Sequence, residues 1–102
     1  MIDLIASKRS AIAELCARHH VSRLSLFGSA ARDDFDISTS DIDLLVTFAP
    51  TAHVNYADNY FQFLEELEAT LGRRVDLVSE SAVKNPYLLR SINADQVQLY
   101  AA

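Results

Sequence analysis

The 102-residue chain has one cysteine, two glycines, two prolines and no tryptophan. Cys16 cannot form a disulfide within one chain, which favours a reducing compartment, so we expect a cytoplasmic protein. The scarcity of glycine and proline excludes collagen-like repeats and low-complexity segments. No apolar run approaches the roughly 18 residues that span a bilayer, and the N-terminus lacks a basic start followed by an apolar block. We therefore expect neither a membrane segment nor a signal peptide.

Basic residues are also scarce, with nine Lys and Arg against 14 Asp and Glu and a formal net charge of -5. This balance argues against a broad electrostatic surface for the phosphate backbone of a nucleic acid. A small anionic ligand held through a metal ion stays compatible with it, because a cation reverses the sign of the local field. Half of the residues are hydrophobic and 23% are charged. That composition and length predict one globular domain over residues 1–102.

Hydrophobic periodicity predicts alternating helices and strands. The helices are expected over residues 2–20, 30–32, 58–71 and 85–92, and the strands over residues 21–27, 42–48, 74–78 and 97–100. Gly72 is expected to end the third helix in a left-handed conformation, and Asn85 with Pro86 to begin the fourth. The pattern predicts an α/β (α+β) fold, a small mixed β-sheet with helices packed mainly on one side. Periodicity leaves the order and direction of the strands open.

Two aspartates lie two positions apart at the start of the second predicted strand. Because side chains alternate along a strand, Asp41 and Asp43 project from one face. Ile42, Leu44 and Val46 then face the core. Two neighbouring carboxylates are electrostatically costly unless a cation neutralises them, and oxygen ligands suit Mg²⁺ or Mn²⁺. The sequence therefore predicts a divalent-cation site here.

A third carboxylate, Asp76, lies between Val75 and Leu77 in the next predicted strand. If the two strands are neighbours, Asp76 projects from the same side as the first two aspartates. Three carboxylates on adjacent strands form a site for two metal ions. Such a pair activates an attacking oxygen and neutralises a leaving phosphate.

Gly28 and Ser29 separate the first strand from a short helix. Glycine lets backbone N–H groups approach a phosphate closely, and the serine hydroxyl adds a donor near a helix N-terminus. Arg32, one turn further on, is placed to reach a terminal phosphate oxygen. A phosphate cradle beside an acidic cluster indicates phosphoryl or nucleotidyl transfer from a nucleoside triphosphate.

Taken singly, each of these features has an ordinary structural explanation. A Gly-Ser pair is usually a turn, an aspartate can cap a helix, and acidic strand residues serve solubility. The combination carries the prediction: Gly-Ser, eleven residues, then Asp-Ile-Asp-Leu, then an apolar-flanked aspartate on a later strand.

The segment FGSAARDDFDISTSDIDLLV, residues 27–46, resembles the motif of the DNA polymerase β-like nucleotidyltransferase superfamily. That motif is an apolar residue, Gly-Ser, a loop, and then Asp-apolar-Asp-apolar. The resemblance is to the minimal nucleotidyltransferases and covers essentially the whole chain. It implies the nucleotidyltransferase fold and transfer of a nucleoside monophosphate, typically AMP from ATP, with pyrophosphate leaving.

The resemblance also implies catalytic roles for the three carboxylates. Asp41 and Asp43 would hold both Mg²⁺ ions and the triphosphate. Asp76 would complete the catalytic metal site and help to deprotonate an acceptor hydroxyl.

The phosphate-binding residues follow from the same resemblance. Gly28 and Ser29 would bind the β- and γ-phosphates, and Arg32 occupies the place of the family's basic residue. Two departures stand out. Asp33 replaces a glycine that many minimal members have, and the acidic loop before Asp41 is one residue longer than usual.

The short chain leaves no room for a further helical domain, so the acceptor must be a small molecule, a partner protein or another copy. Stand-alone minimal members are often encoded beside a HEPN-domain ribonuclease as a toxin–antitoxin pair. The resemblance therefore implies an antitoxin that attaches AMP to a tyrosine of a HEPN toxin. Two alternatives stay open: a binding-only antitoxin, and a subunit that modifies a small molecule such as an aminoglycoside. A homo-oligomer also stays open.

Two further features have competing interpretations. His19 and His20 end the first predicted helix, where a histidine meets the helix dipole favourably, and no third ligand nearby supports a metal site. Aromatic residues gather around the third helix; most should be core, with a partner-facing patch as the second interpretation. They are Tyr56, Tyr60, Phe61 and Phe63.

Overall fold

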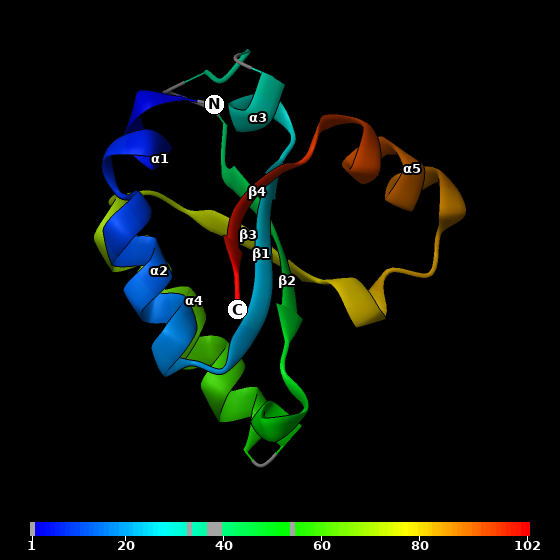
Figure 1. Ribbon diagram of the computed structural model, residues 1–102. Helices are drawn as coiled ribbons and strands as arrows, with labels where there is room; N and C mark the ends of the chain where they lie inside the picture. Colours follow the sequence, from blue (N-terminus) through cyan, green and yellow to red (C-terminus); the bar gives the residue numbers. More distant parts are fainter. Residues whose placement is uncertain (1, 33, 37–39, 54) are drawn as a thin grey trace.

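The computed structural model describes the chain apart from residues 1, 33, 37–39 and 54 (Figure 1). In chain order its elements are α1 (Asp3–Ser7), α2 (Arg9–Arg18), β1 (Val21–Phe27), α3 (Ser29–Arg32), β2 (Ile42–Phe48), the 3₁₀ helix η1 (Pro50–His53), α4 (Tyr56–Leu71), β3 (Val75–Ser79), the 3₁₀ helix η2 (Glu80–Ala82), α5 (Pro86–Asp95) and β4 (Val97–Ala101). None of the described helices is long and apolar enough to cross a membrane.

The four strands form one mixed sheet in the order β3-β2-β1-β4. β1 runs antiparallel to both β2 and β4, whereas β2 and β3 are parallel. In Figure 1, α1, α2 and α4 lie on one side of the sheet and α5 lies on the other. The predicted fold class, a small mixed sheet with helices mainly on one side, is confirmed.

The main core lies between the sheet and the helices α1, α2 and α4. Ile42, Leu44 and Val46 of β2 are fully buried, as the strand period predicts. The other face of the sheet has a smaller apolar layer, where Leu45 is buried and α5, which contacts β1, buries Ile92. The helices contribute Ile5, Ile12, Leu15, Phe63 and Leu67 to the main core.

Several element boundaries differ from the predictions. The helix expected over residues 2–20 is two helices, which meet at Lys8, where the N–H group bonds to the Ile5 carbonyl in a tight turn. α4 begins at Tyr56 after Asn55, and not at Asp58 or Asn59. The segment between β2 and α4, where no regular element was expected, contains the 3₁₀ helix η1. β3 begins and ends one residue later than predicted, and α5 extends to Asp95.

The predicted ends of two helices are confirmed. Gly72 follows α4 with φ of 66°, and its N–H group bonds to the Glu68 carbonyl at 2.8 Å. Asn85 caps α5 by accepting hydrogen bonds from the backbone N–H groups of Tyr87 and Leu88. Both ends depend on local chemistry, which is why sequence alone identifies them.

His19, the residue that follows α2, connects this helix with α4 through polar contacts. Its Nδ1 lies 3.1 Å from Asn59 Oδ1, and Asn59 Nδ2 donates to the His19 carbonyl at 2.8 Å. Its Nε2 contacts Glu66 Oε2, and Arg18 also pairs with Glu66. The Asn59 side chain is therefore bonded to His19, 40 residues away in the sequence. This contact explains why Asn59 does not cap α4.

This contact predicts a pH-dependent stability. The hydrogen bond from His19, and then the charges of His19 and Arg18, hold the pKa of Glu66 below its ordinary value of 4.5. A carboxyl with a lowered pKa stabilises the folded state above its unfolded pKa, and that contribution is lost as the pH falls through the folded pKa. Urea unfolding between pH 3 and pH 7 should therefore show a smaller acid loss for Glu66→Gln than for the wild type. The exposed neighbour Glu65 provides the charge-matched control, and an equal effect of Glu65→Gln would contradict the assignment.

Candidate active site

Asp43 and Asp76 lie side by side at the centre of the site. In the parallel ladder between β2 and β3, Asp43 is opposite Asp76. Neighbouring strands lie about 4.8 Å apart, and both side chains point away from the main core, since Val75 and Leu77 are buried on the other face. Hydrophobic periodicity leaves the order and direction of the strands open. In the structure β2 and β3 are adjacent and parallel. Asp41, exposed, comes directly before β2.

The carboxylates act on one another electrostatically. Partial burial, then the charge of Asp76, then that of Asp41 raise the pKa of Asp43, while Arg32 lowers it. Two neighbouring negative charges on a partly buried face cost free energy until a cation offsets them. Asp76, Asp41 and Arg32 therefore each lie within electrostatic range of Asp43.

Gly28 lies directly against Asp43. It follows β1 with φ of 73°, in the left-handed region, and the last residue of β1, Phe27, is opposite Asp43 in the antiparallel ladder. A Cβ atom at position 28 would stand 2.3 Å from Asp43 Oδ2, far inside van der Waals contact. Any other residue here would adopt a strained backbone angle and displace the Asp43 side chain or the turn. Ser29 begins α3 immediately after it.

Arg32 is held by two acidic residues, Asp34 and Asp95, and no sequence motif links Asp95 with it. Its Nη1 donates to Asp95 Oδ2 at 3.1 Å, and its Nε donates to Asp34 Oδ2 at 3.4 Å. These contacts raise the pKa of Arg32, the bond to Asp95 most strongly. The pairs are solvent-exposed, and such pairs are weak and exchange readily. A phosphate would therefore compete with two carboxylates for this guanidinium. Asp33, which stands where many minimal nucleotidyltransferases have glycine, lies outside the described residues.

The donor chemistry of the site fits a divalent cation bound together with substrate. Within the described part of the chain, no three His, Cys, Asp or Glu side chains are close enough to enclose a metal ion on their own. Mg²⁺ seldom uses such a cage, and binds through one or two carboxylates, waters and the phosphates of its substrate. Asp43 and Asp76, aligned on one face and repelling one another, supply that kind of ligand set.

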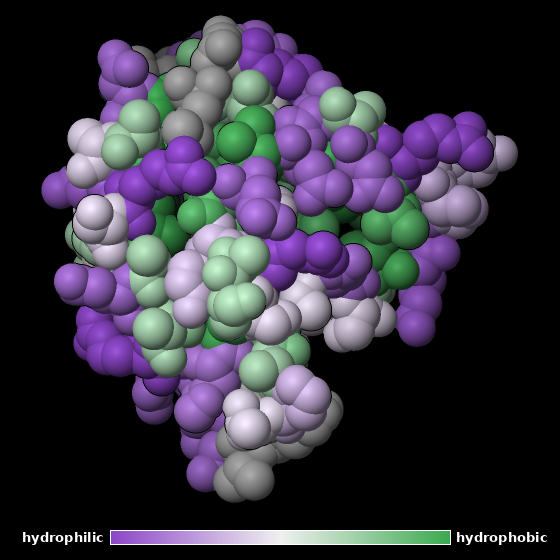
Figure 2. Space-filling model, in the orientation of Figure 1, coloured by the Kyte–Doolittle hydropathy of each residue, from purple (hydrophilic) through white to green (hydrophobic). Residues whose placement is uncertain are grey.

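The histidine and aromatic features are also placed by the structure. Both ring nitrogens of His19 face Asn59 and Glu66, so His19 is a structural contact. Phe63 is fully buried in the core, whereas Phe61 is 59% exposed. On the face shown in Figure 2, hydrophilic residues dominate and hydrophobic atoms appear in separate patches, one beside α5, the helix that carries the exposed Leu88.

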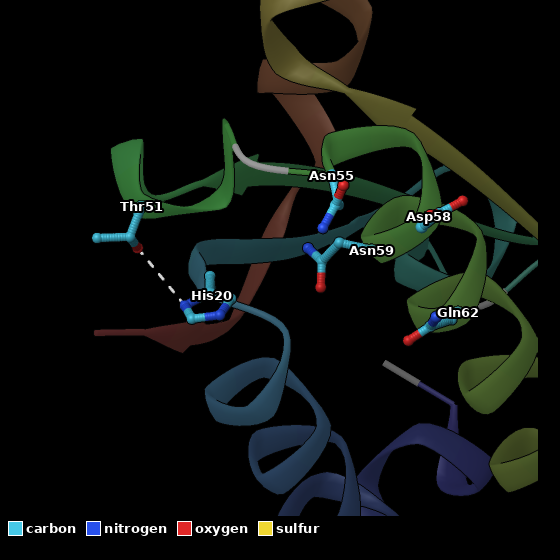
Figure 3. Close-up of a pocket in the computed structure, with 6 residues that line it drawn as sticks. All are labelled: His20, Thr51, Asn55, Asp58, Asn59 and Gln62. Carbon is cyan, nitrogen blue, oxygen red and sulfur yellow. Dashed lines mark hydrogen bonds between the residues drawn. The ribbon is translucent and has the colours of Figure 1, made fainter.

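A polar cavity of about 410 Å³ lies at the opposite end of β1 from Gly28 (Figure 3). Two of its lining residues, His20 and Asn55, have left-handed backbones with φ of 60° and 55°. His20 Nδ1 lies 3.5 Å from Thr51 Oγ1 across it. None of the predicted site residues lines this cavity. Its lining is His20, Thr51, Asn55, Asp58, Asn59 and Gln62.

Comparison with known families agrees with this geometry. Residues 8–97 match the family described as nucleotidyltransferase domain. The chain belongs to this family. The expectation of an enzyme of the nucleotidyltransferase class, drawn from the motif at residues 27–46, is thereby confirmed.

Two relatives illustrate the similarity of this nucleotidyltransferase in sequence. A protein of Methanocaldococcus jannaschii, assigned as a protein adenylyltransferase, is 35% identical over 80 residues, which is 78% of each chain. The protein adenylyltransferase MntA of Thermococcus cleftensis is 38% identical over 72 residues, 71% of this chain and 69% of its own.

Two solved structures illustrate the similarity in fold. A minimal nucleotidyltransferase superposes with a TM-score of 0.76 at 35% identity, over 94% of this chain and 95% of its own. A chain of a toxin–antitoxin structure with AMP-PNP superposes with a TM-score of 0.72 at 25% identity, over 92% of this chain and 73% of its own.

Proposed function

We propose that residues 1–102 act as a single minimal nucleotidyltransferase domain that transfers AMP from ATP to a tyrosine of a HEPN ribonuclease toxin, as its antitoxin. The observation that carries the proposal is the alignment of Asp43 with Asp76 on adjacent parallel strands, with Gly28 against Asp43. Relatives named as protein adenylyltransferases support the AMP transfer. The similar toxin–antitoxin structure with AMP-PNP supports the nucleotide and the toxin partner.

Each residue of the site has a defined part in the proposed reaction. Asp41 and Asp43 would hold two Mg²⁺ ions and with them the triphosphate end of ATP, and the ions would supply Lewis-acid stabilisation of phosphate charge. Gly28 and Ser29 orient the β- and γ-phosphates through backbone N–H groups and the serine hydroxyl. Arg32 exchanges Asp34 or Asp95 for a phosphate oxygen.

The proposed reaction forms one bond to the α-phosphorus of ATP and breaks one. Asp76 accepts the proton of the tyrosine hydroxyl, and the phenolic oxygen forms a bond to the α-phosphorus of ATP. The bond between the α-phosphorus and the oxygen that bridges to the β-phosphorus breaks, and pyrophosphate leaves with that electron pair. The neighbouring carboxylates would repel the triphosphate anion, so we expect transfer to require a divalent cation.

A mass-spectrometric transfer assay tests the proposal. The chain is co-purified with a candidate HEPN toxin, sought among the proteins encoded beside it, and ATP and Mg²⁺ are added. We expect the partner to gain the mass of one or more adenylyl groups on a tyrosine, with no gain in the presence of EDTA. An unchanged partner mass in a stable complex would contradict the transfer reaction.

A binding-only antitoxin is the second candidate, and the observation that favours it is the occupation of Arg32 by Asp34 and Asp95. If masking alone neutralises the toxin, the double variant Asp41→Asn/Asp43→Asn should still protect cells from it. Loss of protection with complex formation intact would favour the enzymatic antitoxin. Transfer of AMP to an aminoglycoside by the chain alone would instead favour a small-molecule nucleotidyltransferase.

A further inference from the structure

Among the described residues, β3, the strand that carries Asp76, pairs with β2 alone and is therefore an edge strand of the sheet. Backbone groups of successive residues point alternately to the two sides of a strand. The Ile42 N–H group donates to the Arg74 carbonyl at 3.1 Å, so the residues in phase with Arg74, including Asp76, present their backbone groups to β2. Val75 and Leu77, on either side of Asp76, present theirs to the open edge.

Two side chains of α4 bond to this open edge, one on each side of Asp76. The Val75 N–H group donates to Glu68 Oε2 at 2.9 Å. The Tyr60 hydroxyl donates to the Leu77 carbonyl. Glu68 and Tyr60 are eight residues apart on α4, so a single helix satisfies the edge on both flanks of the aspartate. Their bonds occupy places where a further strand would otherwise pair.

We propose that Tyr60 and Glu68 are positioning residues for the transfer reaction, and that they act by fixing the backbone on both sides of Asp76. The proposal rests on the function proposed above, because it assigns Asp76 to the reaction. An edge strand bonded on one side only is free to shift and twist, and a shift of the backbone moves the carboxylate that it carries. A displacement of about 1 Å at a reacting group can cost on the order of a hundredfold in rate.

The surroundings of Tyr60 agree with this role. Burial raises the pKa of Tyr60, and the charge of Asp76 raises it further, which places the phenol within electrostatic range of the carboxylate. Its ring is half-buried and packs edge-on against Phe61, at 5.2 Å between centroids. The hydroxyl is held at β3 by its bond to the Leu77 carbonyl.

Tyr56 provides a matched control on the same helix. Its hydroxyl lies 3.2 Å from Ser79 Oγ, a side-chain contact at the far end of β3, three residues beyond Asp76. Tyr56→Phe and Tyr60→Phe each remove one hydroxyl from α4 that contacts β3. Only Tyr60→Phe releases a backbone group next to Asp76.

The expected result is about a tenfold lower rate of AMP transfer at saturating ATP for Tyr60→Phe, with the KM for ATP unchanged. Tyr56→Phe should keep the wild-type rate. Glu68→Ala should lose rate as Tyr60→Phe does, whereas Glu68→Gln should retain it, because the amide oxygen still accepts the Val75 N–H bond. If a variant lost activity only through a general loss of stability, its transfer rate would fall in proportion to its loss of unfolding free energy. The four rates would then not divide into two lowered and two retained.

Amide hydrogen exchange of β3 separates failure of this inference from failure of the proposed function. Exchange at Val75, Asp76 and Leu77 should be faster in Tyr60→Phe and Glu68→Ala than in Tyr56→Phe and Glu68→Gln, with or without any transfer activity. Equal exchange and equal transfer rates across the four variants would overturn the inference. If the wild type transfers nothing but the exchange pattern holds, the anchoring of the edge stands and the transfer function is wrong.

Discussion

Asp43→Asn is expected to lower the rate of AMP transfer by about a thousandfold or more. Asparagine keeps the size of the side chain against Gly28 but removes the charge that would hold a divalent cation and the triphosphate. Metal-assisted charge stabilisation contributes several kcal/mol to a transition state, and each 1.36 kcal/mol is about tenfold in rate. The measurement is the initial rate of adenylyl transfer to the HEPN partner, followed by mass spectrometry with ATP and Mg²⁺.

The same substitution is expected to raise the thermal stability of the metal-free protein. Burial and the charges of Asp76 and Asp41 disfavour ionised Asp43, as the raised pKa indicates. Removing that charge removes the repulsion, so activity and stability should move in opposite directions. Asp58→Asn, an equal change of charge at an exposed position on α4, serves as the control and should leave transfer intact. A lower melting temperature for Asp43→Asn, measured in EDTA, would contradict the assigned repulsion.

Gly28→Ala is expected to reduce transfer by about a hundredfold or more and to destabilise the fold. An alanine with φ of 73° adopts a left-handed conformation that costs roughly 1–2 kcal/mol of folding free energy. Its Cβ atom would also stand 2.3 Å from Asp43 Oδ2. Relief of that overlap must move either the turn or the carboxylate. A displacement of the carboxylate by about 1 Å is enough for a loss of this size. Transfer rates and urea unfolding, measured on the same preparation, check both effects.

Gly72→Ala separates the two causes. Gly72 has nearly the same backbone angle, φ of 66°, but an added Cβ atom there meets nothing within 4 Å. Gly72→Ala should therefore pay the backbone penalty alone, about 1–2 kcal/mol, and keep transfer activity. If both variants lose the same stability and both keep their activity, the contact between Gly28 and Asp43 has no functional weight.

The boundaries that sequence predicts correctly are those that local chemistry sets. β1 and β2 begin and end at the predicted residues, because alternating side chains are bounded by Gly28 after one strand and Pro50 shortly after the other. The start of α4 was predicted wrongly. Asn59, a suitable cap by type, is engaged with His19 at the end of α2, and the helix begins at Tyr56 with Asn55 in the N-cap position.

The pairing of Asp43 with Asp76 shows how far the site is predictable. That Asp41 and Asp43 share a face follows from the strand period. The position of Asp76 next to Asp43 depends on the parallel pairing of β2 and β3. A signal for it was present, because the helix α4 connects these strands, and parallel neighbours need a crossover of that kind.

The amino-acid pattern alone identifies the two-carboxylate motif and the Gly-Ser turn within residues 27–46, and with them the family. It also predicts the fold class, because the hydrophobic periodicity along the chain sets the order of helices and strands. The tertiary structure decides which carboxylates meet, that Arg32 pairs with Asp34 and Asp95, and that Tyr60 and Glu68 secure the edge beside Asp76. The Arg32–Asp95 contact joins residues 63 positions apart. Contacts of that kind depend on how the helices pack on the sheet. This packing involves the whole chain, so it cannot be read from the periodicity of any short segment.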